Sequence, residues 1–247
     1  MRLFLLTTLV MIAFAANSVL IRMAVGVAGL DPALAGVVRL GAGVGVLLTL
    51  TLARWGSAAL RLPPRVALAG MATLFLYILG FTLANGRIDA GVGALILFGS
   101  VQITMFAAAL IGGERLGRWR LIGAGVAFAG LAVLVAPTGG ARVDPLGAAF
   151  MAAGGLGWGL YSLNGRRARD PLGATAVNFV LALLPALAWL ALRGAVPEPT
   201  WGIWPALVSG AVTSGLGYAL WYAVVPRLAA SLAAVAPRSV PVRAALG

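Results

Sequence analysis

The segment DPALAGVVR, Asp31–Arg39, returns 139 residues later as DPLGATAVN, Asp170–Asn178. Each copy begins with Asp-Pro, a pair typical of a helix start, and then continues as an apolar run. Each also carries one polar side chain eight positions after its aspartate, Arg39 in the first copy and Asn178 in the second. The two segments therefore predict helices of the same kind at equivalent places in a repeated unit.

Two further matches have nearly the same spacing. Tyr77 and Phe81 return as Tyr218 and Tyr222 after 141 residues, and Arg87-Ile88 returns as Arg227-Leu228 after 140. Three matches at one spacing predict an internal duplication, with a first repeat over residues 1–138 and a second over residues 139–247. Duplicated bundles of membrane helices are the architecture of many carriers.

Composition identifies the solvent of this chain. Of its 247 residues 62% are hydrophobic and 10% are charged, and the mean hydropathy is +1.03. A soluble domain has about a quarter of its residues charged. The composition predicts an all-α polytopic membrane protein whose main partner is the lipid bilayer.

The charged and reactive residues exclude several functions. All 18 basic residues are arginines, scattered singly or in threes between apolar runs, so a net charge of +12 does not predict nucleic-acid binding. The chain has no cysteine and no histidine, which excludes disulfides, thiol chemistry and most transition-metal sites. We expect no cofactor, no metal and no enzymatic activity, because a nucleophile with a base is also missing.

Apolar runs near the 20 residues needed to cross a bilayer predict eight spans and a doubtful ninth. They are Leu3–Ile21, Ala33–Leu52, Val66–Asn85, Ala90–Gly112, Arg118–Ala136, Pro145–Asn164, Leu172–Leu192, Ala206–Val225 and, as the doubtful one, Leu228–Leu246. A cleaved signal peptide is an alternative for the first run, because Ala13–Ala16 would pass for a cleavage site. The run continues to Ile21, which favours a span.

Arginine placement predicts the orientation. With a cytoplasmic amino terminus, eleven arginines of the ends and loops lie inside and four lie outside, Arg22, Arg87, Arg142 and Arg193. Five spans separate each element from its copy, and five is odd, so the two repeats enter the membrane in opposite directions. The expectation is an inverted-topology repeat in a bacterial-type inner membrane.

Several short motifs carry a family resemblance. The stretches Gly113–Leu116, Leu121–Ala124 and Ala129–Leu131, together with Ala16–Ser18, Arg39 and Gly215–Tyr218, resemble an EamA-type protein of the drug/metabolite transporter superfamily. The resemblance covers nearly all of the chain. It implies ten helices in two inverted five-helix repeats, about nine of them present here, with a substrate cavity between the repeats.

The carboxyl end departs from that family pattern. Pro237, Arg238, Pro241 and Arg243 interrupt the ninth run, and the counterpart of Glu114 would fall beyond Gly247. Such a segment is expected to insert poorly. The alternative function is therefore an incomplete, non-transporting fragment or a subunit that needs a partner, either another chain or a second copy in a homo-oligomer.

Polar and aromatic residues near mid-membrane are the candidates for substrate binding, because polar groups are costly in lipid. They are Asn17, Arg39, Tyr77, Ser100, Gln102, Trp158, Tyr161, Tyr218 and Trp221. Structural alternatives stand beside them: Ser100 and Thr104 as helix-packing or backbone-bonded hydroxyls, Trp158 and Tyr161 as interface aromatics, and Arg39 as a side chain that snorkels to headgroups. The glycine pairs Gly41/Gly45 and Gly155/Gly159 predict close helix packing.

All six acidic residues fall at span ends or in loops. A proton-coupled exporter of organic cations would be expected to carry a carboxylate at mid-membrane, so the chain is not expected to be a cation antiporter. The sequence favours a carrier that moves a small amphipathic metabolite, such as an amino acid or a related compound, by alternating access.

Overall fold

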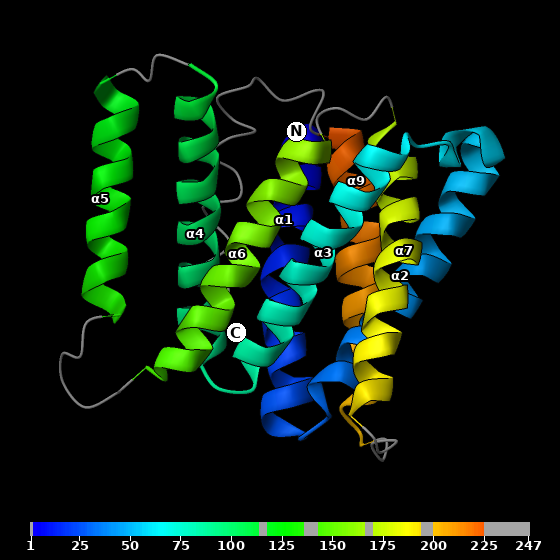
Figure 1. Ribbon diagram of the computed structural model, residues 1–247, viewed down its shortest axis with the longest axis horizontal. Coiled ribbons are helices and arrows are strands. Elements are labelled where there is room, and N and C mark those ends of the chain that lie inside the picture. Colours follow the sequence, from blue (N-terminus) through cyan, green and yellow to red (C-terminus); the bar gives the residue numbers. More distant parts are fainter. Residues whose placement is uncertain (1, 114–117, 136–142, 166–169, 194–199, 225–247) are drawn as a thin grey trace.

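A computed structural model describes residues 2–113, 118–135, 143–165, 170–193 and 200–224, and within these ranges every regular element is helical (Figure 1). In order these are α1 (Arg2–Ile21) with its π-helical continuation η1 (Arg22–Val27), α2 (Pro32–Trp55), the 3-10 turn η2 (Ser57–Leu60), α3 (Pro64–Asn85), α4 (Ala90–Ile111), α5 (Arg118–Val135), α6 (Pro145–Gly165) and α7 (Pro171–Leu192). A last span joins α8 (Ile203–Val208), the π-helical η3 (Ser209–Leu216) and α9 (Gly217–Val224).

The predicted spans and the observed helices agree closely. Each of the first eight predicted spans corresponds to an observed helical segment, and the ends differ by at most three residues except at the first span, whose helix continues through η1 to Val27, six residues beyond the predicted Ile21. Seven of the described helical segments are long and apolar enough to cross a membrane, and α5 is an 18-residue helix outside that set. The predicted ninth span, Leu228–Leu246, lies outside the described residues, as does Arg227-Leu228. The chain is an all-helical, multi-pass membrane protein.

The repeated Asp-Pro pairs begin helices as predicted. The Asp31 carboxylate accepts hydrogen bonds from the backbone N–H groups of Ala33 (2.8 Å) and Leu34 (3.2 Å). The Asp170 carboxylate accepts one from Leu172 (3.1 Å). In both helices proline takes the first position, where no N–H is needed, so local chemistry alone sets where α2 and α7 start.

Successive helices run in alternating directions (Figure 1), and within the first half (α1–α5) helices α1 to α4 pack mainly on helices of the second half (α6–α9). The most extensive pairing is α3 with α6, followed by α2 with α7 and α4 with α6 equally, and then by α2 with η3. Helix α1 packs on η3 and α9, and α5 lies at the edge of the bundle beside α4.

Glycines let α3 and α6 approach until their backbones touch. A Cβ on Gly157 would lie 2.6 Å from the Tyr77 nitrogen and 2.8 Å from the Thr73 oxygen. A Cβ on Gly80 would collide with the carbonyl oxygen of Phe150 and lie 2.7 Å from the nitrogen of Gly154. Small residues at contacts are the usual way that membrane helices gain packing energy, because lipid tails provide no hydrophobic drive for association.

The two predicted glycine pairs have different fates. Gly155 and Gly159 face α4, where an added Cβ would lie 2.5 Å from the Ser100 Cβ and 2.7 Å from the Thr104 Cβ respectively, so the prediction of close packing is confirmed. For Gly41 and Gly45 the prediction is wrong, because a Cβ at either position would have no neighbour within 4 Å. The four-residue spacing marks a smooth helix face but does not say which way that face points.

Three ion pairs lie at one end of the bundle, where α1, α3 and α7 end and α2, α4 and α6 begin. They are Arg22–Asp89 (3.3 Å), Arg87–Asp144 (3.1 Å) and Arg193–Asp31 (2.8 Å). The last two join the first half to the second. The hydrogen bond from Arg87 holds the pKa of Asp144 below its usual value, so this carboxylate stays charged to lower pH than an unpaired aspartate.

The outer surface of the bundle is apolar. Leu5, Leu68, Ile103, Leu184 and Val212 lie on five different helices and are each between 45% and 61% exposed. In water such surfaces would drive aggregation, whereas in a bilayer they meet lipid chains. The exposed faces therefore agree with the membrane assignment made from composition.

Replacing Gly157 with alanine should lower the melting temperature of the purified protein in detergent, because the new methyl group must separate α3 from α6. Overpacking of this kind costs about 1–3 kcal/mol. The matched control is Gly45→Ala, which adds the same methyl group in open space and should be neutral or stabilising by up to about 1 kcal/mol. Equal melting temperatures for the two variants would contradict the close contact.

Candidate functional site

Arg39 lies inside the bundle and does not reach the headgroups, contrary to the snorkelling alternative. Its side chain is 1% exposed. Its Nη2 group donates a hydrogen bond to the Tyr77 hydroxyl (2.9 Å) and its Nε group donates to the Ser214 hydroxyl (3.3 Å). The guanidinium carbon lies 5.1 Å and 5.2 Å from the ring centres of Tyr77 and Phe81, a cation–π arrangement. These contacts replace the water that a buried charge loses.

Asn17 is the second centre of the same cluster. Its amide nitrogen donates to the Tyr77 hydroxyl (3.3 Å), while its amide oxygen accepts from Ser209 (2.7 Å) and Thr213 (3.1 Å). Tyr77 is therefore shared between Asn17 of α1 and Arg39 of α2. We refer to Asn17, Arg39, Tyr77, Ser209, Thr213 and Ser214 as the polar cluster. It connects α1, α2 and α3 of the first half to η3 of the second half.

The local structure of η3 brings its polar side chains to this point. Ser209, Thr213 and Ser214 are all buried, at most 4% exposed. They sit in a π-helical segment, a rare conformation that often occurs at functional sites. Gly210 in the same segment has no side chain, and a Cβ there would collide with the carbonyl oxygen of Arg39. The glycine thus lets α2 approach η3 closely enough for the Arg39 side chain to reach Ser214.

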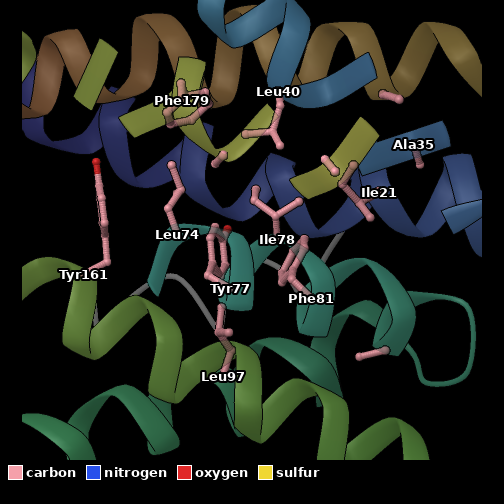
Figure 2. Close-up of a cluster of buried hydrophobic side chains, with 14 of the residues drawn as sticks. Ile21, Ala35, Leu40, Leu74, Tyr77, Ile78, Phe81, Leu97, Tyr161 and Phe179 are labelled. Carbon is pink, nitrogen blue, oxygen red and sulfur yellow. The ribbon is translucent and has the colours of Figure 1, made fainter. Parts of the chain in front are cut away.

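Aromatic rings extend from the polar cluster into the second half. Trp158 of α6 lies 5.0 Å from Tyr77, centre to centre, and stacks on Tyr218 of α9 at 5.3 Å with 24° between the ring planes. Phe179 and Phe14 each lie 5.9 Å from Tyr218. Figure 2 shows Tyr77 and Phe81 of α3 and Phe179 of α7 within one cluster of buried side chains.

Five of the predicted residues come together at or beside this place: Asn17, Arg39, Tyr77, Trp158 and Tyr218. The structure also corrects the alternative for Trp158 and Tyr161 as interface aromatics. Trp158 lies between Tyr77 and Tyr218, and Tyr161 is 3% exposed and donates to the Thr175 hydroxyl (3.1 Å). Tyr161 is therefore buried and Trp158 partly buried, and both side chains contact neighbouring helices.

The other predicted residues lie elsewhere. Ser100 and Thr104 serve the α4–α6 contact, and Thr104 donates to the Ser100 carbonyl of its own helix (2.8 Å), as the packing alternative expects. Gln102 is half-buried on α4, and none of the hydrogen bonds between described residues joins it to the polar cluster. Trp221 contacts Phe14 at 6.2 Å, at the margin of the aromatic group.

Among the described residues, the polar cluster contains a positive charge and no negative one. The four described acidic residues, Asp31, Asp89, Asp144 and Asp170, all precede the first turn of a helix. Asp31 begins the helix that carries Arg39, about 12 Å further along at 1.5 Å per residue, and it already pairs with Arg193. The positive charge of Arg39 therefore has no carboxylate partner among the described residues.

Sequence reasoning missed the three hydroxyls of η3 and the rings of Phe14, Phe81 and Phe179. The spacing of Ser209, Thr213 and Ser214, at i, i+4 and i+5 in an apolar run, was an available signal. A cavity of about 480 Å³ lies apart from the cluster, at the junction of η2 with α7, lined by Trp55, Ala58, Ala59 and Asp170. Because Asp170 there caps α7, we assign this cavity no role.

Comparisons with known proteins agree with this architecture. A model of the EamA-like transporter family matches residues 145–246. An uncharacterized protein of Pseudomonas aeruginosa is 45% identical over 247 residues, which cover 99% of this chain and 84% of that protein. The chain belongs to the EamA-like transporter family. A solved crystal structure is similar to this EamA-like protein with a TM-score of 0.70 and 26% identity, over 97% of this chain and 86% of the other.

Asn17→Ala should destabilise this EamA-like protein, because it removes three side-chain hydrogen bonds and leaves buried hydroxyls on η3 with one acceptor fewer. The expected loss is about 1–3 kcal/mol, measured as a lower melting temperature in detergent. Ser162→Ala is the matched control and should cost little, since among the described residues the Ser162 hydroxyl bonds the Trp158 carbonyl of its own helix (2.8 Å). An unchanged melting temperature for Asn17→Ala would show that the cluster does not hold the halves together.

Proposed function

We propose that this protein is a carrier that moves a small amphipathic metabolite across the membrane by alternating access, with its binding site at the polar cluster and the adjoining rings of Trp158 and Tyr218. The observation that carries the proposal is the burial of a charged arginine and several hydroxyls at the junction of the two halves of an otherwise apolar bundle. Polar groups at that depth are costly, so those that are present usually have a function. An aromatic wall beside them suits a ligand with an apolar body.

The arrangement of the helices supports two inverted repeats. Successive helices alternate in direction, so α1 and α6 run oppositely, as do α2 and α7 (Figure 1). The contacts also follow a two-fold pattern: α3 packs on α6 as the last span packs on α1, and α3 packs on α7 as η3 packs on α2. Carriers of this design bind substrate between the repeats and rock one repeat against the other.

The described conformation closes the site from bulk water. Arg39, Tyr77 and Asn17 are 1%, 5% and 7% exposed. At one end the ion pairs Arg87–Asp144 and Arg193–Asp31 join the halves. Alternating access would require these contacts to break while the site opens toward that end. The arginines of both pairs are about half exposed, and surface pairs contribute about 0–1 kcal/mol each, which a rocking motion can overcome.

Transport should be measured by counterflow of labelled metabolites into proteoliposomes that contain the purified full chain. Trp158→Ala should reduce the rate about three- to tenfold, because it removes a ring that contacts Tyr77 and stacks on Tyr218. The matched control is Trp204→Ala, whose ring is 68% exposed on the outer surface and should have little effect. No counterflow of any carboxylic acid, amine, amino acid or nucleoside by the unmodified protein would contradict the proposed function.

The orientation is a separate proposal, resting on the arginine bias: the amino terminus and the α2–α3 connection are cytoplasmic. The chain has no native cysteine, so single cysteines report the side directly. Ser57→Cys, in exposed η2, should be protected in intact cells from an impermeant maleimide. Val27 lies at the opposite end of the bundle from η2 and is 68% exposed, so Val27→Cys should react with the maleimide. Labelling of Ser57→Cys with protection of Val27→Cys would show that the opposite orientation is correct.

A further inference from the structure

The Arg39 guanidinium has donors that the protein does not use. An arginine has five N–H groups in a rigid planar fork. Tyr77 takes one from Nη2 and Ser214 takes the one from Nε. The buried Nη1 atom has no hydrogen-bond partner among the described residues. Leaving such donors unpaired in a buried place is costly. Nη1 keeps its N–H groups, and Nη2 keeps one N–H group, for a partner that the described residues do not supply.

The surroundings restrict what approaches the Nη1–Nη2 edge. The rings of Tyr77 and Phe81 pack around the guanidinium, and Asn17 is already occupied with Tyr77, Ser209 and Thr213. The remaining polar approach is in the plane of the fork, where two parallel N–H groups match the two oxygens of a carboxylate. Among the described residues, the interior of the helix bundle has no carboxylate that could pair with Arg39 in this way.

From this geometry we propose that the cargo is a small organic monocarboxylate with an apolar or aromatic body, whose carboxylate pairs with the Nη1–Nη2 edge of Arg39. The proposal rests on the proposed carrier function and names its substrate class. The single positive charge of Arg39, which no described carboxylate balances, matches the single negative charge of a monocarboxylate. A phosphate monoester, with a charge of about −1.5 to −2 at neutral pH, would leave excess charge buried. An organic cation would meet like charge.

A free amino acid fits less well than a simple carboxylate. Its ammonium group would add a second positive charge near Arg39, and the described acidic residues, which could balance it, all lie at helix ends. The body of the ligand has suitable neighbours, because Trp158 and Tyr218 continue the aromatic surface away from Tyr77. The class therefore narrows from amphipathic metabolites in general to acids that carry no second charge.

Binding of matched probes to the purified full chain in detergent tests the inference. Equilibrium dialysis with labelled phenylacetate should show saturable binding, and unlabelled phenylacetate should compete at least about tenfold better than the isosteric neutral phenylacetamide, a difference of about 1.4 kcal/mol. Phenyl phosphate and phenethylamine should compete less well than phenylacetate. Equal competition by the amide, or better competition by phenyl phosphate or phenethylamine, would overturn the assignment.

Variants locate the effect on the guanidinium. Arg39→Gln should abolish the preference for the acid over the amide, and Arg39→Lys should keep the preference with affinity at least about tenfold weaker, because the charge remains but the planar fork is lost. The matched control Arg65→Gln, at an exposed position on α3, should bind like the unmodified chain. Undiminished preference in Arg39→Gln would overturn the inference. If that variant does not fold, unchanged phenylacetate affinity in Arg39→Lys would overturn it.

The two proposals fail in different ways. Phenylacetate binding that depends on Arg39, without counterflow of any solute, would leave the anion site standing and remove the carrier. Counterflow of neutral compounds, with no preference for the acid in dialysis, would leave the carrier standing and remove the anion site.

Discussion

A guanidinium that finds no carboxylate partner among the described residues, buried among apolar helices, is the constraint around which the centre of this protein is arranged. An arginine at the centre of a membrane helix costs at least about 2.5–3.5 kcal/mol. The bundle offsets that cost with the Ser214 hydroxyl of η3 and with the Tyr77 hydroxyl and two aromatic faces of α3, while the Asn17 amide of α1 bonds the same Tyr77 hydroxyl. Since no one helix can solvate Arg39 alone, the charge ties the halves of the molecule together.

Close backbone contact is what makes this arrangement geometrically possible. Glycines on α3, α6 and η3 remove the side chains that would otherwise hold the helices apart. Gly210 meets the Arg39 carbonyl, and Gly157 meets the Tyr77 nitrogen, so the two residues that hold the polar cluster are each next to a glycine on the partner element. The polar cluster therefore depends on the glycine contacts, because its side chains can meet only where the helix backbones come close together.

Much of the fold was predictable because it is local. Asp31-Pro32 and Asp170-Pro171 begin helices through hydrogen bonds to their own next turn, and apolar length sets how far each span runs. Part of the site was also predictable, since Asn17, Arg39 and Tyr77 are rare polar residues at mid-depth. The hydroxyls of η3 were not found, and snorkelling to the headgroups stood as an alternative for Arg39, because depth along a helix does not say whether a long side chain turns inward or outward.

The sequence by itself determined that the chain crosses the membrane many times, where its helices begin and end, and which residues are polar at each depth. In lipid every backbone group must be bonded within its own helix, so these properties follow from short stretches of residues. Tertiary structure alone decided how each helix is rotated about its axis. These helices are apolar on nearly every side, so no polar stripe marks an outer face, and the choice passes to contacts with neighbours. That rotation is why Gly155 and Gly159 are buried against α4 while Gly41 and Gly45 meet open space, and why Arg39 turns toward Tyr77 and Ser214.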